Sequence, residues 1–131
     1  MSIFGRTISG RAVAALALLM VLVALLPALS STPSREITLV VRGMAFYVKD
    51  DPRTPNPTLE VRAGERVRIV LENRDWGMTH DFAVPALDAA LDPIDWSEID
   101  TMVFDVPEVP GTYAYICRPH QLMMRGTIRV N

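Results

Sequence analysis

Apolar and polar positions alternate through most of the chain from Glu36 onward. In the segment Glu36–Gly43, the apolar residues Ile37, Leu39 and Val41 occupy every second position, which is typical of a half-buried strand. Comparable short runs recur at regular spacing, separated by Gly, Pro and Asp, at residues 44–48, 58–61, 66–73, 80–84, 101–106, 111–117 and 126–130. About eight strands spaced in this way predict an all-β fold, an antiparallel Greek-key β-sandwich or barrel.

One segment departs from this alternation. Residues 86–100 are too long for a hairpin connection, and their apolar residues recur at helical spacing at Leu87, Ala90, Leu91 and Ile94. A short helix or turn is therefore expected there, with Pro93 ending it.

The first 31 residues follow a different pattern. Arg6 and Arg11 precede an apolar run over residues 12–29, and small residues follow Pro27. This predicts a hydrophobic N-terminal helix that is either a secretory signal peptide cut after Ser30 or an uncleaved membrane anchor. Helix-breaking Pro27, next to small residues, favours cleavage. Both alternatives export the remainder, so we expect residues 32–131 to form one domain in the periplasm or on the extracytoplasmic face of the membrane.

Charge and cysteine content narrow the function of that domain. It holds all 15 acidic residues of the chain and 11 of the 13 basic ones, a formal net charge of −4. Nucleic acid is therefore not an expected partner, because nucleic-acid-binding domains present a basic face. The only cysteine, Cys117, cannot form an internal disulfide, so we expect an exported domain to bury it or to use it.

Metal-binding residue types are concentrated between Cys117 and Met124. Within these eight residues are Cys117, His120, Met123 and Met124, and His80 is the only other histidine of the chain. Thiolate, imidazole and thioether groups form a soft-to-borderline donor set that suits copper. Two histidines, a cysteine and a weak axial methionine are the donor set of blue-copper electron-transfer sites. Zinc bound by Cys117 and both histidines is the alternative, although the thioether favours copper.

The sequence "GTYAYICRPHQLMMRGTIRV" resembles the C-terminal motif of the cupredoxins, the small blue copper proteins. Their pattern is G-x-Y-x-[FY]-x-C-x-P-H, followed within a few residues by M-x-G and a last strand. Upstream, "PTLEVRAGERVRIVLENRD" and "GMTHDF" are similar to the family's approach to its first histidine ligand. The resemblance extends over residues 37–131. It implies a cupredoxin fold with one mononuclear type 1 copper, bound by His80, Cys117, His120 and an axial methionine.

The same resemblance separates the two adjacent methionines. In the family, one residue and then glycine follow the axial methionine, and here that sequence is Met124, Arg125 and Gly126. Met124 is therefore the expected axial ligand. Met123 gives the shorter loop of amicyanin but lacks the following x-Gly, and we expect it to face the surface near His120.

Two residues beside the expected ligands differ from the family pattern. Many cupredoxins have Asn after the first histidine and Ser or Thr after the cysteine, and these side chains hold the two ligand loops together. This sequence has Asp81 and Arg118 at those positions. We expect a charge-assisted contact between them to serve the same purpose, and the alternative is that Arg118 points into solvent.

The implied function is the transfer of single electrons between redox partner proteins, such as a cytochrome or an oxidoreductase, by a monomeric domain. An apolar patch of Met78, Pro119, Leu122 and Met123 around His120 would contact them, and the acidic run 88–100 would steer a basic partner. Two histidines and one cysteine are too few for the extra copper centres of copper enzymes, so enzymatic activity is not expected. An exported copper chaperone, or a membrane-anchored subunit of a respiratory or photosynthetic complex held by residues 12–29, remains as an alternative.

Overall fold

The computed structural model describes residues 13–15, 17–21 and 32–131. Residues 13–15 and 17–21 are helical, so a short helix is present near the N-terminus. The expected cleavage site and Pro27 lie outside the described residues. Within the described residues, the structure contains no helix with the length and apolar character that a membrane span requires. The chain forms two units, residues 1–32 and 33–131, and the second contains all of the strands discussed here.

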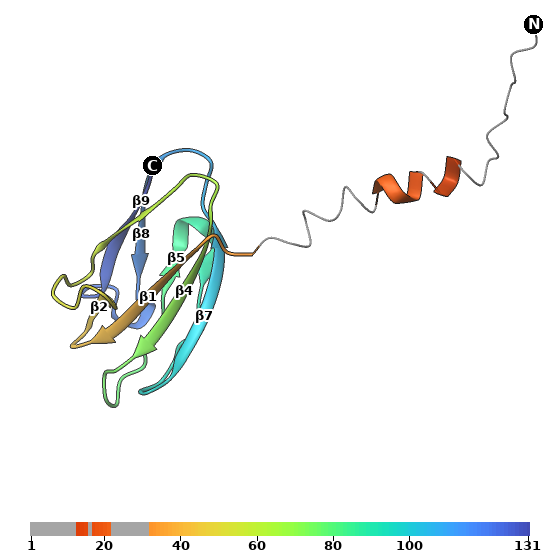
Figure 1. Ribbon diagram of the computed structural model, residues 1–131. Helices are drawn as coiled ribbons and strands as arrows, with labels where there is room; N and C mark the ends of the chain where they lie inside the picture. Colours follow the sequence, from red (N-terminus) through yellow and green to blue (C-terminus); the bar gives the residue numbers. More distant parts are fainter. Residues whose placement is uncertain (1–12, 16, 22–31) are drawn as a thin grey trace, which may run out of the picture. The chain divides into compact units, whose positions relative to one another are not determined.

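The second unit is a β-sandwich of two sheets (Figure 1). One sheet has the strand order β2-β1-β4-β7, and the other has the order β3-β9-β8-β5-β6. The strands are β1 (Arg35–Arg42), β2 (Ala45–Val48), β3 (Thr58–Val61), β4 (Arg66–Asn73), β5 (Ala83–Val84), β6 (Ala89–Ala90), β7 (Ile99–Asp105), β8 (Gly111–Ile116) and β9 (Arg125–Val130). The expected sandwich is confirmed, with nine strands rather than about eight because β6 is an additional two-residue strand.

The pairing of the strands is mixed rather than wholly antiparallel. β1 runs parallel to β4, with Ile37 opposite Ile69, and β3 runs parallel to β9, with Leu59 opposite Ile128. The expectation of an antiparallel sandwich was wrong for these two pairs. Alternation of apolar residues shows which side chains face inward, but it does not show the direction of the neighbouring strand.

The segment between β5 and β7 is mostly extended. A single 3-10 turn, η1 (Pro85–Leu87), ends at Asp88, whose φ of 49° lies in the left-handed region, and β6 then pairs with β5. The helical spacing of Leu87, Ala90, Leu91 and Ile94 therefore does not correspond to an α-helix. Leu91 and Ile94 are nonetheless buried, because backbone hydrogen bonds to Phe82 and His80 draw the loop against the core.

The aromatic rings of Phe46, Phe82 and Tyr115 pack on one another in the core. Tyr115 stacks on Phe82 with 5.1 Å between ring centroids and meets Phe46 edge-on at 5.5 Å. The Tyr115 hydroxyl donates to the carbonyl of buried Pro57 at 2.7 Å, so this polar group is satisfied inside the core. Tyr115 is opposite Gly126 across β8 and β9, and a Cβ at Gly126 would collide with the tyrosine ring. This packing explains why glycine follows Met124 by two residues.

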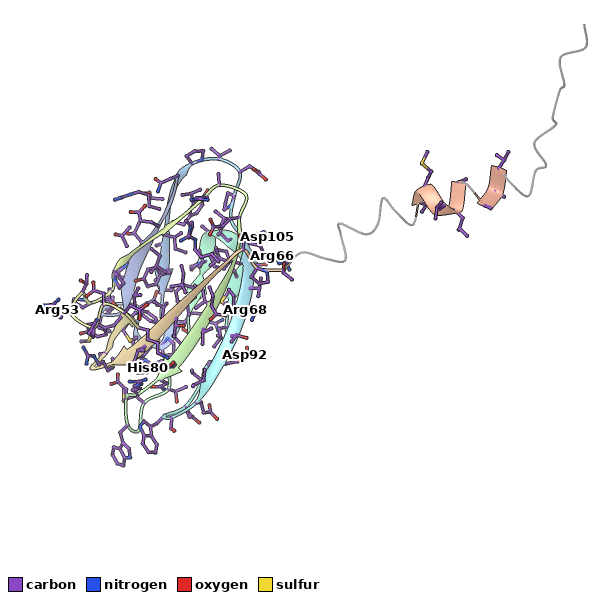
Figure 2. All side chains as sticks on the ribbon, viewed as in Figure 1. Arg53, Arg66, Arg68, His80, Asp92 and Asp105 are labelled. Atoms are coloured by element: carbon purple, nitrogen blue, oxygen red, sulfur yellow. The ribbon has the colours of Figure 1, made fainter. Side chains whose placement is uncertain are left out.

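The expected ligands gather at one end of the sandwich. β4 ends at Asn73, β8 ends at Ile116, and the segments that follow carry His80 and Cys117. Figure 2 shows His80 near this end, whereas Arg66 and Asp105, which pair at the start of β4, mark the opposite end.

Candidate metal centre

His80 is fixed by a backbone bridge rather than by a strand of its own. Its N–H donates to the carbonyl of Ile94 at 3.0 Å, and the N–H of Ile94 donates to the carbonyl of His80 at 2.8 Å. The residue is completely buried. The bridge therefore holds the imidazole inside the end of the sandwich, where a buried histidine needs polar partners.

The other three candidate ligands lie in one closed turn between β8 and β9. The N–H of Cys117 donates to the carbonyl of Met124 at 3.0 Å, and the N–H of Met124 donates to the carbonyl of His120 at 2.9 Å. Between them the 3-10 turn η2 (Arg118–His120) begins directly after Cys117, with Pro119 in its first positions, where no backbone donor is needed. Cys117, His120 and Met124 are thus held together by backbone hydrogen bonds.

Each imidazole ring has an oxygen acceptor beside its Nε2 atom. His80 Nε2 lies 3.1 Å from Asp75 Oδ2, and His120 Nε2 lies 3.2 Å from the carbonyl oxygen of Thr79. Because both partners are oxygen acceptors, they favour the tautomer that carries its proton on Nε2, which leaves a lone pair on Nδ1 for a metal. His80 Nδ1 lies 3.6 Å from Cys117 Sγ, and the two ring centroids are 4.9 Å apart. The structure thus brings His80, Cys117 and His120 together as expected from the sequence.

The donor set can be tested against the metal that it implies. In the described part of the chain, no group of three His, Cys, Asp or Glu side chains forms a cluster that could hold a metal ion. The donor types, the burial of His80 and Cys117, and the tautomer favoured in both rings fit copper.

Burial also sets the protonation of the candidate ligands. Removal from water raises the pKa of the Cys117 thiol, although the nearby backbone amides of Asp81 and His120 partly oppose this. Burial likewise lowers the pKa of His80, in spite of the neighbouring Asp75 carboxylate. His80 is therefore neutral at pH 7, the form that can bind a metal, whereas Cys117 would release its proton on binding one.

The two methionines occupy different environments. Met124 is fully buried in the core cluster that also contains Cys117, whereas 62% of the Met123 surface is exposed. The Met123 carbonyl accepts a hydrogen bond from the Asn56 amide at 3.1 Å, so its backbone is fixed while its side chain faces outward. The expected outward position of Met123 is confirmed, and the choice of Met124 as axial ligand stays a prediction.

The expected contact between Asp81 and Arg118 is confirmed. Asp81 is buried, and its carboxylate accepts the backbone N–H of Arg118 at 2.7 Å and the Arg118 Nε–H at 2.6 Å. Arg118 Nη2 also donates to the carbonyl of Leu91 at 3.2 Å, although about half of the side chain is exposed. Because these residues directly follow His80 and Cys117, the pair joins the two segments that carry the candidate ligands.

Asp75 is a further residue of the site that the sequence analysis did not identify. Its carboxylate contacts His80 Nε2 and also accepts the backbone N–H groups of Gly43 and Met44. Its position five residues before a histidine, in a loop after β4, gives no sequence signal of this contact, because the acceptor role depends on the distant β1–β2 turn.

A shallow concavity of about 330 Å³ borders the partly exposed His120. Of the residues expected to form an apolar patch there, Pro119, Leu122 and Met123 line it, whereas Met78 does not. Met44, from the β1–β2 turn, lines it as well. Leu122 is 93% exposed, so this rim presents apolar side chains to solvent beside a candidate ligand.

Comparisons with solved structures agree with the fold described above. Auracyanin B has the same fold with a TM-score of 0.62 and 21% sequence identity, over 76% of this chain and 91% of that one. Auracyanin from the photosynthetic bacterium Roseiflexus castenholzii matches with a TM-score of 0.60 and 16% sequence identity, over 76% of this chain and 99% of that one. The multicopper oxidase McoA from Aquifex aeolicus matches with a TM-score of 0.60 and 14% sequence identity, over 77% of this chain but only 27% of that one. These likenesses establish the fold.

Curated protein sequences gave no significant match to the chain. Residues 55–131, however, match the copper binding proteins of the plastocyanin/azurin family, and this segment is more than half of the chain. It contains β3 to β9 and all four candidate ligands. The chain therefore belongs to the plastocyanin/azurin family of copper-binding proteins.

Proposed function

We propose that this protein is an exported type 1 copper protein that carries single electrons between redox partners and is not itself an enzyme. His80, Cys117, His120 and Met124 would hold the one copper ion. The observation that carries the proposal is the orientation of both imidazoles, whose Nε2 atoms contact oxygen acceptors while His80 Nδ1 faces the buried Cys117 sulfur at 3.6 Å. Bound there, copper supplies a one-electron couple between Cu(I) and Cu(II).

The protein's own residues suit this role by keeping the site rigid. The bridge between His80 and Ile94, the hydrogen bonds of the 117–124 turn and the Asp81–Arg118 pair restrain the candidate ligands from separate parts of the chain. Side chains held in this way rearrange little when the charge at the site changes, so the barrier to electron transfer stays low. His120, at the partly exposed edge, would provide the route to a partner.

A basic redox protein is the partner that the surface charge supports. Every charged residue from Asp75 to Cys117 is acidic, and most of them are exposed: Asp88, Asp92, Asp95, Glu98, Asp100, Asp105 and Glu108. Such an acidic run would attract a basic cytochrome or oxidoreductase domain and would repel nucleic acid. The apolar rim beside His120 would make the short-lived contact itself.

The proposed location is the periplasm or the extracytoplasmic face of the membrane. The apolar run over residues 12–29 after two arginines supports export, by either a cleaved signal peptide or a retained anchor. A retained anchor would support the alternative of a subunit in a larger respiratory or photosynthetic complex. N-terminal sequencing of the native protein distinguishes the two.

Addition of Cu(II) to the purified full chain should produce an intense visible thiolate-to-copper absorption band. The Cys117→Ser variant should lack this band, because the serine hydroxyl cannot replace the thiolate donor. Absorption and EPR spectra of both proteins provide the measurement. A colourless complex that exchanges its metal quickly would instead support the copper-chaperone alternative, and preferential binding of Zn(II) over copper would support a zinc site.

Replacement of the two adjacent methionines should have unequal effects. Met124→Leu should raise the reduction potential by at least ~59 mV, the equivalent of a tenfold loss in relative Cu(II) affinity, because it removes a weak axial donor. The swap nearly conserves volume, so stability should fall by less than about 1.5 kcal/mol. Met123→Leu, at an exposed position, serves as the matched control. Voltammetry that shows the larger shift for Met123→Leu would reverse the assignment.

A further inference from the structure

The Asp75 carboxylate bridges two parts of the molecule that are far apart in sequence. One side faces the Nε2 atom of buried His80 at 3.1 Å. The other side accepts two backbone N–H groups from the turn between β1 and β2, those of Gly43 and of Met44, the latter at 2.9 Å. Asp75 is thus the only described side chain within hydrogen-bond distance of His80 Nε2.

The turn has the conformation needed to provide both donors. Arg42 pairs with Ala45, which leaves Gly43 and Met44 as a two-residue hairpin loop. Both have positive φ angles, 55° and 62°, the conformation of a tight primed turn. That conformation is unfavourable for a non-glycine residue such as Met44, so a carboxylate that accepts its N–H helps to retain it.

The carboxylate is itself restrained. The Asp75 N–H donates to Asn73 Oδ1 at 3.0 Å, and buried Asn73 Nδ2 donates to the carbonyls of Met78 and Ile94 at 2.8 Å and 3.0 Å. Asn73 therefore connects the Asp75 loop to the Ile94 segment that also bridges to His80. With the Asp75 side chain 13% exposed, the carboxylate has little freedom to turn toward water.

The geometry points to Asp75 as a positioning residue that holds His80 for copper, an inference that rests on the proposed function. As acceptor of the Nε2–H, Asp75 fixes the tautomer with a free lone pair on Nδ1 and sets the plane of the ring. A carboxylate acceptor also increases the electron density that the imidazole offers through Nδ1. Cu(II) gains more from that density than Cu(I), because it is the harder and more highly charged ion.

The test uses Asp75→Asn in the full chain, with Glu98→Gln as the matched control. Glu98 also carries a carboxylate in the neighbouring loop, its backbone carbonyl bonds the N–H of Asn73, and its side chain contacts Asp95 rather than His80. Asp75→Asn should weaken Cu(II) binding by about 10–100-fold and Cu(I) binding less. Each tenfold difference between the two ions raises the reduction potential by ~59 mV. The control should change neither affinity by more than about twofold.

A second measurement needs neither copper nor the variant. Nitrogen-15 NMR of the histidine rings in the metal-free wild-type protein should show His80 protonated at Nε2, with a proton that exchanges slowly with water. Protonation at Nδ1 instead would overturn the inference. Equal changes of the reduction potential in Asp75→Asn and Glu98→Gln would overturn it as well. A failure of the proposed function is distinguishable, since wild-type protein would then lack the thiolate-to-copper band whatever the tautomer of His80.

Discussion

Gly126→Ala should lower the free energy of unfolding of the metal-free protein by about 2–5 kcal/mol, a large part of the stability of a domain of this size. The added methyl group would occupy the position of the Tyr115 ring, which lies across the hairpin from Gly126. Overpacking of a core of this kind costs about 1–3 kcal/mol. Displacement of the ring would also break the bond between the Tyr115 hydroxyl and the Pro57 carbonyl, and each buried polar group left unpaired costs about 1–3 kcal/mol.

The matched control for this substitution is Gly111→Ala in the same hairpin. Gly111 begins β8, and a Cβ there would meet no atom closer than 3.9 Å. It should therefore change stability by less than about 1 kcal/mol. Urea unfolding of both variants, followed by tyrosine and tryptophan fluorescence, gives the comparison. If the two variants unfold at the same urea concentration, the Tyr115 ring can move aside freely and the packing explanation is wrong.

Arg118→Met should destabilise the protein by about 2–4 kcal/mol. It leaves the buried Asp81 carboxylate with the backbone N–H of Arg118 and without its cationic partner. The loss of one partner of a buried ion pair costs about 3–5 kcal/mol. We expect a smaller value because about half of the Arg118 side chain is exposed and water can reach the gap.

A double variant and a surface control make this second test specific. Asp81→Asn combined with Arg118→Met removes both charges, so the double variant should be more stable than Arg118→Met alone. Arg129→Met breaks an exposed pair with Glu60 of similar length, 2.7 Å, and should cost less than about 1 kcal/mol. An Arg118→Met variant as stable as Arg129→Met would show that the Asp81 contact adds nothing. In copper-loaded protein, Arg118→Met should also weaken metal binding, because the pair joins the segments of His80 and Cys117.

Much of the fold could be predicted from the chain because its strands alternate clearly. Ile37, Leu39 and Val41 indicated a half-buried strand, and each lies in β1 of the sandwich. The helical spacing of Leu87 to Ile94 was misleading, since the same spacing arises when an irregular loop folds two residues against a core. Asp88 in the left-handed region and the pairing of β6 with β5 prevent a helix there, and neither feature is visible in a pattern of apolar residues.

The site was predictable as far as its residues depend on local sequence. Cys117, His120 and Met124 belong to one turn, so their spacing in the sequence is enough to predict that they lie together. The contact between Asp81 and Arg118 could be predicted because each residue directly follows a candidate ligand. Asp75 could not be found in this way. Its role depends on a turn 32 residues earlier that directs the N–H of Gly43 toward it, and this arrangement exists only after the sheets have formed.

The parallel pair of β3 and β9 has a consequence for when the protein can acquire its metal during synthesis. Glu60 and Arg129 are paired across this contact although 69 residues separate them. A chain that is still emerging, and that stops short of β9, would therefore have β3 unpaired and the 117–124 turn without its second strand. The order of the strands along the chain thus leaves the proposed metal site without its full framework until the last strand is in place.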